Sequence, residues 1–305
     1  MRKKILIFGS NGLVGSSTKR ILAKTDFEVI ASNRSDTDLF NLDQVKNKIK
    51  DIKPNIIVNA AAKVGGILAN NTYRSEFLIE NLKINMNILE ACIPYPDIKI
   101  INLGSSCIYP LNAENPIKES SIMEGKLEQT NSPYAMAKLS AIELGNSLSI
   151  QYGHQVINLM PTNLYGPNDN FDDNNSHVIP GLISRMHQAK ISNSSKFQIW
   201  GSGTPLREFL YVDDLAYAIE FIICRDIDSN LINIGSGEEV SIMDLAQTIK
   251  NIVGYDGELD FDKTKPDGNP RKLLDSSQIT KMGWQPKFDL ETGIKNTYDW
   301  FLGNN

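Results

Sequence analysis

Four side chains near the middle of the chain have the types and the spacing that ketone reduction requires. Tyr134 and Lys138 lie four residues apart in SPYAMAKLSAIELGNSL, and Ser105 and Cys107 lie upstream in NLGSSCIYP. A spacing of four predicts that the phenol and the ammonium group share one face of a helix, one turn apart. A free phenol has a pKa of about 10, and a neighbouring positive charge lowers it. Tyr134 is therefore expected to give or take a proton near neutral pH.

The hydroxyl and the thiol widen the chemistry that this position could support. Ser105 follows a predicted strand, at the carboxyl edge where open parallel sheets bind their ligands. Its hydroxyl can bond a substrate carbonyl oxygen, which Tyr134 protonates as a hydride arrives. Lys138 is expected to hold the ribose of the nicotinamide. Because residues two apart on a strand point to one face, Ser105 and Cys107 are expected to act on the same molecule.

The other cysteines and the histidines have less specific settings. Cys92 and Cys224 lie in apolar helical patterns and are interpreted as small buried apolar residues. Cys107 is instead favoured as functional, because it lies beside the proposed reactive carbonyl. His177, in NNSHVIP, either caps a loop or is the acid partner of Cys107. The two remaining histidines are interpreted as surface residues: His154 and His187.

A glycine-rich loop near the start of the chain has the form G-x-x-G-x-x-G, between the first predicted strand and the first predicted helix. Glycines there permit a tight turn and let backbone N–H groups approach a pyrophosphate at the helix N-terminus. The pattern in this context predicts a dinucleotide site. The expected contacts are the residues of the loop: Gly9, Ser10, Asn11, Gly12, Leu13, Val14 and Gly15.

The end of the second predicted strand bears on the choice between NAD and NADP. NAD-binding units usually place an acidic residue there to bond the ribose 2′-hydroxyl. This chain instead has Ser32, Asn33 and Arg34. A guanidinium suits a 2′-phosphate better, so NADP is favoured. In the alternative interpretation Asp36 serves as the ribose acid and Arg34 is a solvated loop residue.

These residues must be positioned by strands and helices that alternate along the first half of the chain. Apolar runs predict strands over 3–9, 28–32, 55–62, 98–106 and 155–167. Helices are predicted over 12–25, 38–53 with Asp38 as its cap, 75–92, and from Pro133 onward. The alternation indicates an α/β fold, a Rossmann-type doubly wound parallel sheet with a smaller mixed α/β lobe for the substrate. We expect the nucleotide domain to comprise 1–165 plus 205–235, and the second lobe 166–204 plus 236–305.

The composition limits the class of protein. The chain has 305 residues, 41% of them hydrophobic, and a formal net charge of −5, which argues against a nucleic-acid surface. Three cysteines form no disulfide framework, and no metal-ligand spacing is present, so no metal is expected. No apolar run approaches the ~20 residues of a membrane span. The N-terminal MRKKILIFGS is interpreted as a strand rather than a signal peptide, and a cytoplasmic location is expected.

Longer segments resemble the extended short-chain dehydrogenase/reductase family and, more narrowly, its GDP-L-fucose synthase branch. They extend from about Gly9 to Leu302 and are far more specific than the glycine loop or Y-x-x-x-K. The diagnostic strings are AAKVGGILANNTY (61–73), LGSSCIYP (103–110), PYAMAK (133–138), MPTNLYGPNDNF (160–171), SHVIP (176–180), WGSGTPLREFLYVDD (200–214) and KPDGNPRKLLD (265–275).

The resemblance implies NADPH-dependent 3,5-epimerisation and 4-reduction of a GDP-4-keto-6-deoxy sugar, most simply GDP-4-keto-6-deoxy-mannose. In that family the residues matching Ser105, Tyr134 and Lys138 perform the reduction. Those matching Cys107 and His177 are the base and the acid of epimerisation at C3 and C5. The cofactor contacts implied beyond the glycine loop are Arg34, Leu103, Gly104, Ser105, Ser106, Lys138, Pro161, Thr162, Asn163, Leu164 and His177. The sugar-nucleotide contacts implied are Arg185, Trp200, Arg207 and Asp267.

One departure from the family and several alternatives remain at this stage. The family's loop often carries Arg where this chain has Asn11, so selectivity for NADP rests largely on Arg34. A related GDP-4-keto-6-deoxyheptose or a dideoxyhexose precursor is an alternative substrate, with or without epimerase action. A sugar 4,6-dehydratase would need an acid pair after the serine, which SSCIYP lacks. A different class of function is a regulatory protein that binds NADP without catalysing a reaction. The complete set of reductase residues argues against that alternative. By analogy of fold, a homodimer formed through two long helices is expected.

Overall fold

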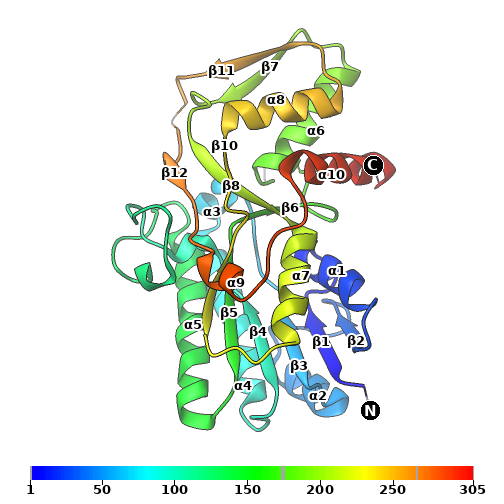
Figure 1. Ribbon diagram of the computed structural model, residues 1–305, viewed down its shortest axis with the longest axis vertical. Helices are drawn as coiled ribbons and strands as arrows, with labels where there is room; N and C mark the ends of the chain where they lie inside the picture. The colour runs from blue at the N-terminus through cyan, green and yellow to red at the C-terminus, as the bar shows by residue number, and fades with distance from the viewer. Residues whose placement is uncertain (1, 173–175, 266, 305) are drawn as a thin grey trace.

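The central element of the structure is a six-stranded parallel sheet (Figure 1). The structure is a computed structural model that describes residues 2–172, 176–265 and 267–304. The strand order is β2-β1-β3-β4-β5-β9. The strands are β1 (Lys4–Phe8), β2 (Glu28–Ser32), β3 (Ile56–Asn59), β4 (Lys99–Leu103), β5 (Val156–Pro161) and β9 (Leu231–Ile234). The order reverses between β1 and β3, and this switch point is where open α/β sheets bind ligands.

Helices cover both faces of this sheet, as the alternation in the sequence predicts. One face carries α1 (Leu13–Leu22) and α7 (Val212–Ile223). The other carries α2 (Leu42–Ile52), α4 (Arg74–Cys92) and α5 (Ser132–Tyr152). Alternate strand residues face different cores, so Ile5 and Ile7 pack with α7 while Leu6 and Phe8 pack with α2 and α4. This two-sided burial explains why the strands read as continuous apolar runs.

The helix ends follow local chemistry, with one correction to the sequence prediction. Pro133 lies in the first turn of α5, where its missing N–H costs nothing. Asp38 was expected to cap α2, but that prediction is wrong. The helix begins later, and the Asn41 side chain accepts a hydrogen bond from the Gln44 N–H at 3.1 Å. Asp38 instead accepts from the Phe40 N–H, at 3.0 Å, in the turn before the helix.

A second group of elements lies above the carboxyl ends of the sheet strands in Figure 1. Strand β7 (Lys196–Trp200) pairs with β11 (Glu258–Asp262), and β8 (Leu206–Tyr211) pairs with β6 (Asn163–Tyr165), β10 (Glu239–Ser241) and β12 (Arg271–Lys272). The helices of this group are α6 (Val178–Ile191), α8 (Ile242–Val253) and α10 (Leu290–Asn304). They share a separate core that includes Ile183, Phe197, Leu245 and Tyr298. The short elements of the chain are α3 (Ile67–Thr72), α9 (Ser277–Lys281), η1 (Ser106–Ile108) and η2 (Glu119–Ser121).

A fully buried carboxylate ties the second group to the sheet. Glu208 of β8 accepts hydrogen bonds from the N–H groups of Gly237, at 2.8 Å, and Leu274, at 3.1 Å. Its backbone carbonyl accepts from Thr162 Oγ1, at 3.1 Å, and Asn163 Nδ2, at 2.8 Å. Burial raises the pKa of Glu208 despite these hydrogen bonds. The contacts hold β8 against the segments that follow β5 and β9.

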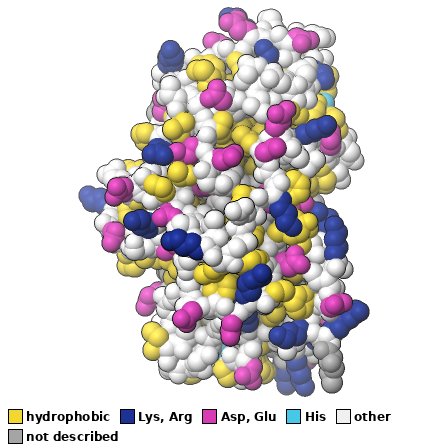
Figure 2. Space-filling model, in the orientation of Figure 1, with side chains coloured by type: hydrophobic (Ala, Val, Ile, Leu, Met, Phe, Trp, Pro, Cys, Tyr) yellow, Lys and Arg dark blue, Asp and Glu magenta, His cyan; other side chains and the backbone are white. Residues whose placement is uncertain are grey.

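The surface charges and the apolar character of the helices bear on the surroundings of the protein. On the face that Figure 2 shows, basic and acidic side chains are interspersed rather than segregated. Within the three described ranges, no helix combines the length and the apolar character needed to cross a bilayer.

Candidate active site

The glycine loop forms a close-packed turn at the switch point of the sheet. Gly9 has φ +75°, and a Cβ atom there would lie 2.7 Å from Ala61 Cα at the end of β3. A Cβ on Gly15 would overlap the Gly9 carbonyl oxygen. Gly12 precedes the first turn of α1, and no side chain caps that turn. The loop therefore presents uncapped helix N–H groups next to backbone that only glycine permits, which fits a pyrophosphate.

The turn after β2 leaves the arginine available and engages the acid. The Asp36 carboxylate accepts the Asn33 N–H at 3.0 Å, and the Asn33 side chain accepts the Ser35 N–H at 2.7 Å. Asp36 is therefore occupied in closing the turn. The Arg34 side chain is exposed, with its guanidinium 5.4 Å from the centre of the Phe40 ring. This arrangement fits a 2′-phosphate at Arg34 better than a ribose hydroxyl at Asp36.

Lys138 lies between the sheet and the phenol. It is only 2% exposed, and its Nζ donates to the Leu103 carbonyl at 2.6 Å. The same nitrogen lies 5.8 Å from the centre of the Tyr134 ring. Burial lowers the pKa of Lys138 to about 8. The predicted helix face is thus present, and the ammonium group lies at the carboxyl end of β4.

The pKa of Tyr134 departs in the opposite direction from the sequence prediction. Burial is the largest effect and raises the pKa of Tyr134, and the Cys107 sulfur raises this pKa further. A hydrogen bond with Ser105 lowers the pKa but does not outweigh these two effects. The expectation that Lys138 lowers this pKa is wrong for the protein without ligands, because desolvation dominates. The phenol is consequently protonated at neutral pH. A protonated phenol is the form that donates a proton to a developing alkoxide.

Ser105 and Cys107 reach the phenol through a tight turn. The expectation that they share a strand is wrong, since β4 ends at Leu103 and the chain then forms η1. Ser105 Oγ accepts the Cys107 N–H at 3.2 Å, so the two side chains are joined within one turn. Because both affect the ionisation of Tyr134, the structure gathers three of the predicted site residues at one point.

Sequence reasoning missed Asn131, which also contacts this group. Its Nδ2 lies 3.4 Å from Cys107 Sγ, within hydrogen-bonding distance of the sulfur. Asn131 precedes the first residue of α5, three positions before Tyr134. The signal available in the sequence was a cap-type residue directly before the Ser-Pro-Tyr that opens the helix.

His177 precedes the first turn of α6, and its side chain is exposed. The imidazole still lies near enough to other protein atoms that partial desolvation lowers its pKa. Among the described residues, no hydrogen bond joins His177 to Cys107 or Tyr134. The other two histidines differ from prediction: His154 is buried, with neither ring nitrogen hydrogen-bonded, and His187 is partly buried, with Nδ1 2.9 Å from the Tyr298 hydroxyl.

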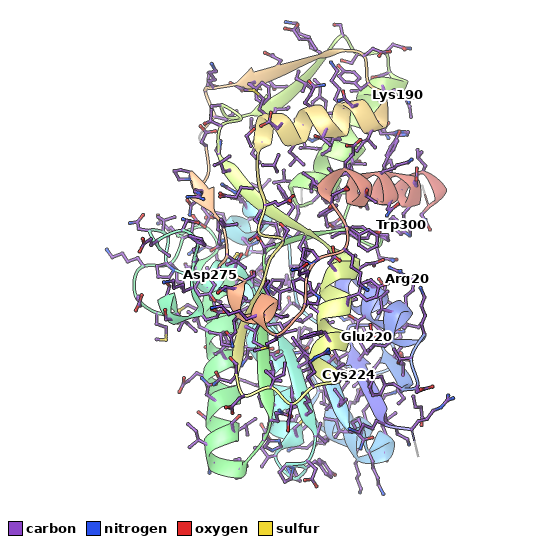
Figure 3. The ribbon with its side chains drawn as sticks, viewed as in Figure 1. Arg20, Lys190, Glu220, Cys224, Asp275 and Trp300 are labelled. Carbon is purple, nitrogen blue, oxygen red and sulfur yellow. The ribbon has the colours of Figure 1, made fainter. Side chains whose placement is uncertain are left out.

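The two other cysteines differ in how far they are buried. Cys92 is buried, as predicted, and burial raises its pKa to about 12. The prediction that Cys224 is buried is wrong, because it follows the end of α7 and is exposed (Figure 3). Neither lies in the Ser105–Tyr134 group. Within the described ranges, His, Cys, Asp and Glu side chains form no group of three that could hold a metal ion.

Three of the four residues expected to bind the sugar nucleotide lie at one corner of the second group. The Asp267 carboxylate accepts from the Ser202 N–H, at 2.9 Å, and from Ser202 Oγ, at 2.7 Å, just beyond Trp200. Trp200 is 67% exposed at the end of β7. Arg207 on β8 is partly buried, which lowers its pKa, and nearby Asp267 acts in the opposite sense.

Arg185, the fourth residue, lies on α6. Its guanidinium is 5.2 Å from the centre of the Phe197 ring, and its Nε donates to the Gly181 carbonyl at 3.2 Å. The cofactor contacts expected from 161–164 run from the end of β5 into β6. There Thr162 and Asn163 donate to the Glu208 carbonyl, and β6 pairs alongside β8.

Comparison with known proteins assigns the chain to a family. Residues 5–235 match the family described as "NAD dependent epimerase/dehydratase family". The chain is 46% identical to GDP-L-fucose synthase 1 of Arabidopsis thaliana, over 99% of this chain and 94% of that protein. A GDP-L-fucose synthetase from Naegleria fowleri bound to NADP superposes with a TM-score of 0.90 at 31% identity, covering 100% of this chain and 95% of that one. A GDP-mannoheptose C4 reductase from Campylobacter jejuni with NADP bound gives 0.88 at 33% identity, covering 99% and 98%. The protein therefore belongs to the NAD dependent epimerase/dehydratase family.

Proposed function

We propose that the protein converts GDP-4-keto-6-deoxy-mannose to GDP-L-fucose by NADPH-dependent 3,5-epimerisation and 4-reduction. The observation that carries the proposal is the thiol of Cys107 beside the Ser105 and Tyr134 hydroxyls, with Lys138 behind them. A ketone reductase needs the hydroxyls and the ammonium group but has no use for the thiol. The similarity to GDP-L-fucose synthase over nearly the full chain supports the same activity.

NADP(H) is the cofactor that the residues of the dinucleotide site fit. The close-packed glycine loop and the uncapped start of α1 suit the pyrophosphate. Arg34 suits the 2′-phosphate, because Asp36 is engaged in its own turn. Lys138 is proposed to hold the nicotinamide ribose. When bound, NADPH supplies the hydride that reduces C4.

The reduction step uses the two hydroxyls as an oxyanion site. Ser105 and Tyr134 bond the C4 carbonyl oxygen, and Tyr134 donates its proton as the alkoxide forms. The raised pKa of Tyr134 keeps that proton in place until negative charge develops on the substrate oxygen. The Lys138 charge then favours the phenolate that remains.

The epimerisation steps use the same oxyanion site and add two residues. The 4-ketone makes the C3 and C5 protons acidic, since the resulting anion spreads onto the oxygen that Ser105 and Tyr134 hold. Cys107 removes a proton, and His177 returns one to the opposite face. Desolvation lowers the pKa of His177, which disfavours the protonated imidazole. A negative charge on the bound sugar nucleotide raises that pKa and so favours the protonated imidazole that the acid role uses.

The sugar nucleotide is proposed to contact the second group of elements. Arg207 is partly buried, and no ion pair with a carboxylate of the described residues reaches it, so a diphosphate would supply the missing charge. Arg185 is proposed as a second diphosphate contact. The exposed Trp200 ring offers a surface for the base or the sugar, and Asp267 offers an acceptor for hydroxyls.

A C4 reductase of a GDP-4-keto-heptose is the second candidate, favoured by the similarity to the Campylobacter jejuni reductase. Protein with Cys107→Ser separates the two functions. Under the proposal, this variant loses solvent-deuterium exchange at C3 and C5 but still reduces an already epimerised ketone. Equal losses in both activities would refute the role of Cys107. Failure of the unaltered protein to oxidise NADPH with any GDP-4-keto sugar would refute both enzymes and leave an NADP-sensing protein.

We also propose the larger-scale organisation of the molecule. The nucleotide domain comprises 1–165 plus 205–235, and the substrate lobe 166–204 plus 236–305, with β6 and β8 of the first extending into the sheet and the core of the second. A homodimer is proposed through the outer faces of α4 and α5, which expose Ile79, Met86, Met136 and Ile150. A cytoplasmic location is supported by the three unpaired cysteines. Light scattering of the protein and of Ile150→Glu would test the dimer, which that change should dissociate.

A further inference from the structure

An amide group lies against the sulfur of Cys107. Asn131 Nδ2 is 3.4 Å from Cys107 Sγ, and it is the one side-chain donor to the sulfur among the described residues. The other end of the amide, Asn131 Oδ1, is buried and has no hydrogen-bond partner. An unpaired buried carbonyl oxygen is costly, typically by about 1–3 kcal/mol, unless a ligand supplies the donor. The amide is therefore hydrogen-bonded to the thiol at one end and unpaired at the other.

Asn131 does not make the contact that its position in the helix would normally give it. An asparagine before the first residue of a helix usually accepts an N–H of the first turn through its side chain. Here no such hydrogen bond forms at α5. One candidate donor is missing because Pro133 has no N–H. The side chain is directed to Cys107 instead, at the expense of helix capping.

The turn that carries Asn131 is fixed from two sides. The Glu128 carboxylate accepts from the Thr130 N–H at 3.0 Å, from Thr130 Oγ1 at 2.6 Å and from the Asn131 N–H at 3.1 Å. On the other side of the turn, Arg74 of α4 donates to the carbonyls of Gln129, at 2.9 Å, and Thr130, at 3.3 Å. These contacts restrict the backbone, so the amide has a set distance from the sulfur.

We propose that Asn131 is a positioning residue for Cys107, donating a hydrogen bond from Nδ2 that stabilises the thiolate, with Oδ1 accepting a hydroxyl of the bound ketosugar. The proposal rests on the proposed function. When the base acts, the substrate C–H bond breaks, an S–H bond forms, and the electron pair moves onto the C4 carbonyl. The thiolate must exist beforehand, and a donor aimed at sulfur favours it over the thiol.

The ionisable groups around the sulfur determine how its pH dependence is interpreted. Tyr134 remains a neutral phenol, because burial raises its pKa. Burial also acts to raise the pKa of Glu128, but the hydrogen bonds from Thr130 and Asn131 outweigh it, and the pKa is lowered. Glu128 therefore stays ionised across the range of the assay. Lys138 has a pKa of about 8 and is common to every variant, so comparisons between variants cancel it.

The first test measures the thiol without substrate. In the full-length protein with Cys92→Ser and Cys224→Ser, Cys107 is the one thiol left, and its alkylation by iodoacetamide is followed by peptide mass spectrometry against pH. Asn131→Leu, which lacks the donor, should react about tenfold more slowly at pH 7 and shift the pH midpoint upward by about one unit. Asn131→Asp should slow the alkylation and raise the midpoint at least as much. Asn131→Ser keeps a donor, so its rate and midpoint should lie between those of Asn131→Leu and the protein with Asn131 intact. The exposed Asn251→Asp on α8 is the matched control. Unchanged midpoints in folded Leu and Asp variants would overturn the proposal.

The second test separates this proposal from the proposed function. Asn131→Leu should slow solvent-deuterium exchange at C3 and C5 about tenfold, and raise the KM for reduction of an already epimerised ketone about fivefold with kcat within twofold. If Cys107→Ser exchanges deuterium at the rate of the unaltered protein, the proposed function fails. If Cys107→Ser is inactive in exchange and Asn131→Leu is unaffected, the proposed function stands and the assignment of Asn131 is refuted. An unchanged KM would refute the contact at Oδ1.

Discussion

Replacing Lys138 with Met should change how the stability of the unliganded protein depends on pH. Lys138 is 2% exposed, and burial lowers its pKa from 10.5 to about 8. At ~1.4 kcal/mol for each pKa unit, the buried charge destabilises the folded protein by roughly 3 kcal/mol at pH 7. A group whose pKa is lower in the folded state binds more protons when unfolded between these two values. Folding stability from this group therefore rises as the pH increases from about 8 to 10.5.

Lys138→Met removes this contribution, because methionine carries no charge to desolvate. It also leaves the Leu103 carbonyl without its donor, which offsets part of the gain by about 1–3 kcal/mol. The unpaired Leu103 carbonyl does not titrate, so it shifts the free energy of unfolding by the same amount at every pH. We expect the free energy of unfolding of the variant, minus that of the unaltered protein, to fall by roughly 2 kcal/mol between pH 7 and pH 9.5.

Urea unfolding of the two unliganded proteins at half-unit pH steps measures this difference directly. Other groups that titrate in this range are common to both proteins and cancel. Lys50→Met, on the exposed face of α2, is the matched control and should show no such change. The opposite outcome is that the free energies of unfolding of Lys138→Met and the unaltered protein differ by the same amount at every pH. That result would refute the view that this ammonium group is buried and destabilised.

Three further substitutions test separate parts of the site. Tyr134→Phe should lower kcat for reduction by about 10²–10⁴-fold and leave NADPH binding, followed by cofactor fluorescence, unchanged; a loss below tenfold would contradict its role as proton donor. Arg34→Ser should raise the KM for NADPH about 10–100-fold with little effect on NADH, and equal effects on the two cofactors would place the 2′-phosphate elsewhere. Arg207→Met should weaken GDP binding about 10–100-fold in calorimetry, whereas exposed Arg225→Met should not; unaltered affinity in both would exclude Arg207 as a diphosphate contact.

Local patterns explain how much of the fold could be predicted. The strands are continuous apolar runs because helices cover both faces of the sheet, and the glycine loop lies where β1 meets α1. The cap of α2 was harder to predict, because both Asp38 and Asn41 suit that role and the backbone decides between them. His154 was wrongly placed on the surface, since its burial depends on residues distant in the sequence.

The candidate site was predictable where its geometry is local. The spacing of Tyr134 and Lys138 sets their shared helix face without tertiary information. The relation of Ser105 to Cys107 depends on a turn that the apolar run of β4 does not reveal. The pKa of Tyr134 depends on burial, which the sequence does not state, and burial outweighs the lysine charge that the sequence does show. Asn131 was missed because its contact with Cys107 spans 24 positions of the sequence.

The most direct measurement of the central claim is the structure of the product formed in deuterated water. The protein would be incubated with GDP-4-keto-6-deoxy-mannose and NADPH, and the product analysed by proton NMR and mass spectrometry. If one oxyanion site serves both reactions, the product is GDP-L-fucose with deuterium at C3 and C5 and the NADPH hydrogen at C4. A C4-reduced product that keeps the configuration and the protons of the substrate at C3 and C5 would contradict it.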